Sequence, residues 1–87
     1  MKRNDEFILK SIAGMTVLVP FGLKSFDVNG IIKLNETAKF LWDHSTGDFT
    51  AETLINDLMK EYKFDRETAA ESVEIYIDKM KEVGSIE

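Results

Sequence analysis

The fold is decided by Gly30-Ile31-Ile32-Lys33-Leu34-Asn35-Glu36-Thr37-Ala38-Lys39-Phe40-Leu41-Trp42, in a sequence of 87 residues. Residues 31–34 predict a short strand, in which Lys33 stands between apolar side chains. Asn35 follows at once, and Asn is a preferred N-cap because its side-chain oxygen accepts a hydrogen bond from the first helical turn. We therefore predict a strand that passes directly into a first helix. The apolar face of that helix would be formed by Ala38, Leu41 and Trp42.

Upstream of this stretch, two apolar runs predict an antiparallel hairpin. Residues 7–13 and 15–19 are rich in Ile, Leu and Val, and the turn is expected near Ala13-Gly14-Met15. Pro20 ends the second run because proline has no N–H for the ladder. Residues 21–30 are expected to form a loop before the third strand.

Downstream, two further amphipathic helices are predicted. Thr50 is the N-cap of the second, with Phe49 and Leu54 as a hydrophobic staple, and Asp65 is the N-cap of the third. Their apolar positions are Ala51, Leu54, Ile55, Leu58, Met59 and Tyr62, then Ala69, Val73, Tyr76, Ile77, Met80 and Val83. The predicted order is β-β-β-α-α-α. We expect an α+β, winged helix-turn-helix-like fold, with a three-stranded antiparallel sheet followed by three helices.

Length and composition predict a single domain over residues 1–87. The sequence contains no Cys, which excludes disulfides, thiolate nucleophiles and Cys-ligated metal centres, and a small domain without disulfides fits the cytoplasm. Charged residues interrupt the N-terminal apolar run, so we expect no signal peptide and no membrane partner. We also expect no cofactor and no metal site.

The charge is negative overall and unevenly distributed. The formal net charge is −5, and most of the acidic excess lies after residue 40. Glu67, Glu71, Glu74 and Asp78 would line one face of the third helix, either as a solvated face or as a surface that attracts a basic partner. This charge weakens a nucleic-acid function, and we expect no nucleic-acid partner.

Several residues allow both a structural and a functional interpretation. Asp43-His44-Ser45 contains the residue types of a hydrolytic triad, but adjacent residues cannot adopt the relay geometry, so a solvated helix end is expected. Trp42 fits the core better than a ligand anchor. Lys33 could meet an acidic ligand residue or point to water. No catalytic residue is predicted, and an enzyme would be limited to carboxylate chemistry.

Ser72, Ile75 and Lys79 share a face of the third helix that is distinct from its core stripe. Ile75 is an apolar side chain among polar neighbours. Either it packs at the periphery of the core, or it faces a ligand cleft.

The stretch 30–42, with its Leu-Asn-x-Thr-Ala core, resembles the signature of the pyrroloquinoline quinone biosynthesis protein D (PqqD) family. Residues 13–20 are similar to that family's first hairpin, and Phe49-Thr50 and Phe64-Asp65 also fit. Domains of this type are called recognition elements for ribosomally synthesised, post-translationally modified peptides (RiPPs). The resemblance covers roughly residues 7–86, and it suggests a free-standing adaptor, because little of the chain remains for a catalytic domain.

The resemblance implies a mechanism and a set of partners. The leader of a precursor peptide would add as a strand beside the third strand, with its side chains in the cleft against the third helix, as in β-augmentation. The peptide-binding residues would be Ile31, Ile32, Lys33, Leu34, Ser72, Ile75 and Lys79. A modifying enzyme would be the second partner, and a radical SAM enzyme, a cyclodehydratase, a dehydratase and a protease all stay open.

Two other interpretations stay open as well. A winged-helix DNA-binding regulator is the alternative function, since the fold permits it. A homodimer is the alternative use of an exposed strand edge.

Overall fold

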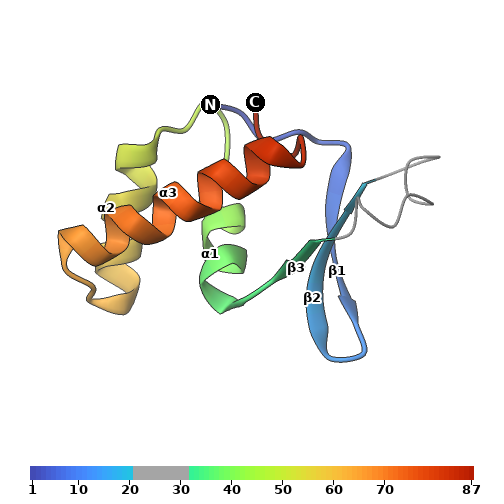
Figure 1. The fold of residues 1–87 in the computed structure, drawn as a ribbon, viewed down its shortest axis with the longest axis horizontal. Helices are drawn as coiled ribbons and strands as arrows, with labels where there is room; N and C mark the ends of the chain where they lie inside the picture. Colours follow the sequence, from blue (N-terminus) through green and yellow to red (C-terminus); the bar gives the residue numbers. More distant parts are fainter. Residues whose placement is uncertain (21–31) are drawn as a thin grey trace.

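The structure of the chain, a computed structural model, describes residues 1–20 and 32–87. Its elements follow the order β1-β2-β3-α1-α2-α3, as predicted (Figure 1). They are β1 (Phe7–Ile12), β2 (Met15–Pro20), β3 (Ile32–Leu34), α1 (Glu36–His44), α2 (Ala51–Tyr62) and α3 (Arg66–Glu82). The predicted loop 21–30 and Ile31, the predicted first residue of the third strand, lie outside the described residues.

The sheet is antiparallel, with the strand order β1-β2-β3. Ala13 and Gly14 form a two-residue turn, and both have positive φ, 52° and 78°. Positive φ at both positions is the geometry of a type I′ turn, whose twist matches that of the strands it joins. The predicted run 7–13 therefore ends one residue early, because Ala13 belongs to the turn.

Each helix begins at its predicted N-cap. The Asn35 side chain accepts a hydrogen bond from the Ala38 N–H at 2.8 Å, and Asp65 caps α3 in the same way. Thr50 caps α2 and forms a reciprocal capping box with Thr53. These caps satisfy backbone donors that a helix leaves free at its start.

The hydrophobic core lies between one face of the sheet and the three helices. Trp42 is buried there, so its assignment to the core is confirmed. Ile32 and Leu34 are buried from β3, whereas the intervening Lys33 is exposed. The other buried core residues are Leu18, Leu41, Phe49, Leu54, Ile55, Leu58, Ala69, Val73, Tyr76, Ile77, Met80 and Ile86.

The first residues of the chain pair with the last ones, which the sequence did not predict. Lys2 and Glu87 exchange two backbone hydrogen bonds of 2.9 Å, and Arg3 forms a bridge with Ile86. The termini consequently lie side by side (Figure 1). The Arg3 guanidinium also lies 5.0 Å from the Trp42 ring centroid and donates to the Trp42 carbonyl at 3.1 Å. This contact places the Arg3 guanidinium over one face of the Trp42 ring.

Candidate functional site

β3 is an edge strand. It pairs with β2 on one side, and among residues 1–20 and 32–87 no strand lies on its other side. An unpaired edge presents N–H and C=O groups to which another chain can bind.

The hairpin turn sets the direction of the backbone groups in β2. Ile12 and Met15 flank a two-residue turn, so they form a hydrogen-bonded pair. Such pairs recur at every second residue of an antiparallel ladder. Thr16 and Leu18 therefore direct their backbone N–H and C=O groups away from β1 and toward β3.

On β3 the same alternation leaves one described residue pointing outward. Leu34 lies opposite Thr16, and Ile32 lies opposite Leu18, so these two residues use their backbone groups toward β2. Lys33 lies between them. Its N–H and C=O consequently point to the open side of the sheet, where a guest strand would meet them.

A cleft runs along this edge, between β3 and α3. It has a volume of about 140 Å³. The cleft is lined by Ile32, Lys33, Leu34, Asn35, Ala38, Ile75, Tyr76, Lys79 and Met80. The edge therefore borders a hollow with a mainly apolar wall.

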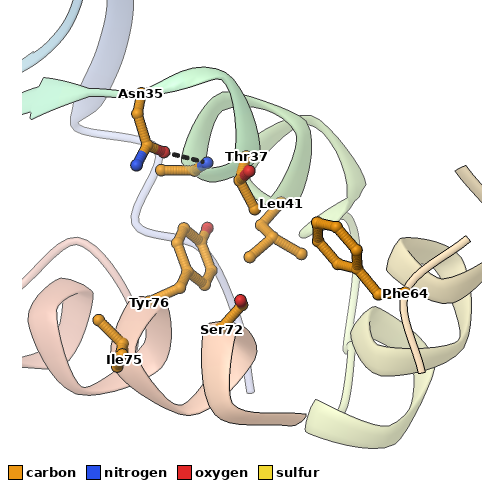
Figure 2. A pocket seen from close by; sticks show the side chains of 8 residues that line it. Asn35, Thr37, Leu41, Phe64, Ser72, Ile75 and Tyr76 are labelled. Atoms are coloured by element: carbon orange, nitrogen blue, oxygen red, sulfur yellow. Dashed lines mark hydrogen bonds between the residues drawn. The ribbon is translucent and has the colours of Figure 1, made fainter. Parts of the chain in front are cut away.

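The cleft continues into a larger cavity of about 250 Å³ between α1 and α3. Figure 2 shows its side chains converging from α1 and its N-cap, the α2–α3 connection and the side of α3 that faces α1. The lining residues are Asn35, Thr37, Ala38, Leu41, Phe64, Ser72, Ile75 and Tyr76. Asn35, Ala38, Ile75 and Tyr76 line both hollows, so the two form one continuous groove.

Ile75 stands on the rim between the two hollows. Its side chain is 64% exposed, more than the other exposed large apolar residues of the described chain, Ile12 and Met15. Covering such an exposed apolar side chain with a ligand removes apolar surface from water, which favours binding.

Tyr76 forms part of the groove wall and is held by hydrogen bonds below it. Its hydroxyl lies 3.0 Å from the Ser45 hydroxyl, which donates to the Leu41 carbonyl at 2.6 Å. Burial raises the pKa of the Tyr76 phenol to about 12. Ser45 is fully buried, so the expectation of a solvated helix end is wrong for this residue, although Asp43 and His44 are exposed.

Residues 8–86 match the sequence model of the family described as Coenzyme PQQ synthesis protein D (PqqD). The chain belongs to this family. A solved structure described as TbiB1 in complex with the TbiA(beta) leader peptide has a similar fold, with a TM-score of 0.75. The two chains are 18% identical, and the match covers 100% of this chain and 95% of that one. No curated protein matches the chain in sequence.

Most of the residues of this chain that were predicted to bind a peptide lie together in the structure. Ser72 lines the α1–α3 cavity, Lys79 lines the β3–α3 cleft, and Ile75 lines both. The side chains of Ile32 and Leu34 are buried, so these two contribute mainly to the floor of the cleft. Ile31 lies outside the described residues.

The predicted peptide-binding set did not include seven further residues that line the groove: Asn35, Thr37, Ala38, Leu41, Phe64, Tyr76 and Met80. A functional role for Asn35 had been weighed against an N-cap, and the N-cap was preferred. Ala38, Leu41, Tyr76 and Met80 had been assigned to the apolar faces of their helices. Their helical spacing was read correctly, but a residue at the edge of a core face can also line a groove. Only the packing of α1 against α3 in the structure reveals that this part of the core face is left uncovered.

The described residues hold no constellation typical of catalysis. His44 Nδ1 lies 3.2 Å from a carboxylate oxygen of Asp57, whereas Ser45 is directed into the core. Among residues 1–20 and 32–87 no three His, Cys, Asp or Glu side chains are placed to hold a metal ion. In the same part of the chain, no helix has the length and apolar character needed to cross a membrane.

Proposed function

We propose that this chain is a peptide-binding adaptor, which holds the leader of a ribosomally made precursor peptide and presents it to a separate modifying enzyme. The observation that carries the proposal is the outward-facing backbone of Lys33 beside a continuous groove. Main-chain hydrogen bonds would supply affinity, and the groove would supply specificity. TbiB1, which has the same fold, was solved with a leader peptide.

In this proposal the chain acts by binding and catalyses no reaction itself. The peptide would contact Ile31, Ile32, Lys33, Leu34, Ser72, Ile75 and Lys79. The modifying enzyme is of a class still to be identified, a radical SAM enzyme among them. We also propose a cytoplasmic location, where small domains without disulfides are usually found.

The charges of α3 argue against the DNA-binding alternative. Glu67, Glu71, Glu74 and Asp78 are exposed on the helix that would have to enter the major groove. Carboxylates on that helix would repel the phosphate backbone. A homodimer through the β3 edge would compete with the peptide for the same backbone groups.

The test uses 15-residue synthetic peptides tiled across the short open reading frames that neighbour the gene. They are titrated into ¹⁵N-labelled protein, with amide shifts and hydrogen exchange as readouts. We expect one peptide to bind with a dissociation constant in the micromolar range, about −8 kcal/mol. It should protect the Lys33 amide, while the Ser11 amide on the β1 edge stays unchanged.

Two results would contradict the proposal. One is that no tiled peptide binds. The other is that the shifts map to α2 or to β1 and leave the amides of β3 and α3 in place. Light scattering of the free protein and of the complex would show whether a dimer dissociates as the peptide binds.

A further inference from the structure

The groove has an apolar end and a basic end. Phe64 and Ser72 line only the α1–α3 cavity, whereas Ile32 and Lys79 line only the β3–α3 cleft. Because Ile75 and Tyr76 line both hollows, α3 passes from the apolar end to the basic end between Ser72 and Lys79.

The sheet geometry fixes where the side chains of a guest strand would point. In an antiparallel guest, the residue opposite Lys33 would exchange both backbone hydrogen bonds with it. The side chain of that residue would emerge on the same face of the sheet as the Lys33 side chain. The guest residues on either side would point into the groove. One would lie level with Leu34, toward Ile75, and the other level with Ile32, toward Lys79.

Two exposed cations stand at these positions. Lys33 and Lys79 are exposed, and neither forms an ion pair with a carboxylate of the described residues. Lys33 would lie directly across from the central guest residue. Opposite charges at directly facing positions stabilise a strand pair, and like charges destabilise it.

We propose that the segment bound here is a strand with one large apolar residue and two acidic residues in succession, an inference that rests on the proposed function. In an antiparallel guest the order is apolar, acidic, acidic. The apolar side chain lies against Ile75 and Tyr76, the first carboxylate faces Lys33, and the second faces Lys79. A parallel guest would carry the same three residues in reverse order.

The experiment selects binders from a library of random 12-residue peptides displayed on ribosomes. Three baits are used: the wild-type chain, the double variant Lys33→Glu/Lys79→Glu, and the control Lys60→Glu/Lys81→Glu. Both variants change the net charge by the same amount, and all four lysines are exposed. The selected peptides are mapped by amide shifts, so that only binders at the β3 edge are compared.

We expect the wild type and the control to select an apolar residue followed by two acidic ones. The double variant should select basic residues at the same two positions. A wild-type binder should lose affinity for the double variant by about tenfold, as expected for two partly exposed ion pairs turned repulsive, and by less than about twofold for the control.

The outcomes separate this inference from the adaptor function. If binders map to the β3 edge without acidic residues, or if the double variant still selects acidic residues, the charge pattern is wrong and the adaptor function stands. If selected peptides bind only elsewhere on the chain, both are wrong.

Discussion

The sheet has two edges, and within the described residues both are unpaired, yet only the β3 edge faces an apolar wall from a helix. β3 faces α3, whose Ile75 and Tyr76 form an apolar wall. The hollow beside β1 is lined by strand residues and by a single side chain from outside the sheet, that of Lys39. From this comparison we expect that free backbone groups alone do not make a peptide site.

The physical reason lies in what each edge can offer a guest strand. On β1, Leu9 and Ser11 point their backbone groups outward by the same alternation that applies to Lys33. Backbone pairing alone replaces hydrogen bonds to water, so its net gain is small. On β3 the proposed guest would also cover apolar surface, and this second contribution would make binding selective.

The largest expected effect comes from a proline at each edge. Lys33→Pro removes an N–H that points to the guest, and it leaves a guest carbonyl unpaired in the groove. We expect the affinity for the peptide to fall by about thirtyfold, roughly 2 kcal/mol. Ser11→Pro removes an equivalent outward N–H from β1 and should leave the affinity unchanged. Fluorescence anisotropy of a labelled leader peptide measures both.

Two controls keep this comparison sharp. Lys33→Ala retains the N–H and removes the charge, so it should lose much less affinity than Lys33→Pro. The fluorescence of the buried Trp42 reports whether each variant is folded. Equal losses for the two proline variants, both folded, would mean that the edges do not differ in the way proposed.

The second prediction concerns the groove wall, for which the β1 edge has no counterpart. The pKa of the Tyr76 phenol is raised to about 12, against an ordinary value of 10. The folded state therefore holds this proton more tightly than the unfolded state. The stability that depends on this proton is fully present below pH 10. As the pH rises from 10 to 12, the unfolded state loses the proton first, and the free energy of unfolding falls by about 2 kcal/mol.

Urea unfolding of the wild type and of Tyr76→Phe at several pH values tests this dependence. At pH 8 the variant should be about 1 kcal/mol less stable, because it loses the hydrogen bond to Ser45. Between pH 10 and 12 the difference should shrink and reverse. If the two proteins lose stability in parallel, Tyr76 does not carry the effect.

The sequence predicts features that depend on local signals, such as the strands and helices, but it does not predict which sheet edge faces a helix. Local signals were sufficient for the elements: Asn35, Thr50 and Asp65 each cap a helix by bonding within the next three residues. Ile75 was recognised as an anomaly because polar neighbours surround it. Such residues can be identified from their neighbours in sequence, because their signals do not depend on contacts with distant parts of the chain.

The remainder depends on contacts between distant parts of the chain. Tyr76 meets Ser45 across 31 residues, and Asn4 donates its backbone N–H to Ser85. The periodic spacing of apolar residues within a helix or strand does not indicate either contact. The groove arises where α1 and α3 leave a gap, and no spacing within one helix encodes that distance.

A third prediction compares the exposed apolar side chains of the two regions. Ile75 is 64% exposed beside the groove, and Ile12 is 48% exposed at the end of β1. Ile75→Ala should weaken peptide binding by about tenfold, as for an apolar anchor at an interface centre. Ile12→Ala should leave binding unchanged, and both should stay within about 0.5 kcal/mol of the wild-type stability. Calorimetric titration of the three proteins decides between anchoring and ordinary peripheral exposure.

The smallest effect is expected where the β3 edge passes into α1. Asn35→Ala removes the N-cap and should cost about 1 kcal/mol of unfolding free energy, and Thr50→Ala should cost a similar amount at α2. Only Asn35 also lines the groove, so only Asn35→Ala should lower the peptide affinity, by a few fold. Asn35→Asp keeps the capping oxygen and should restore the stability. If Thr50→Ala weakens binding as much as Asn35→Ala does, the loss comes from general destabilisation, and Asn35 acts only as a cap.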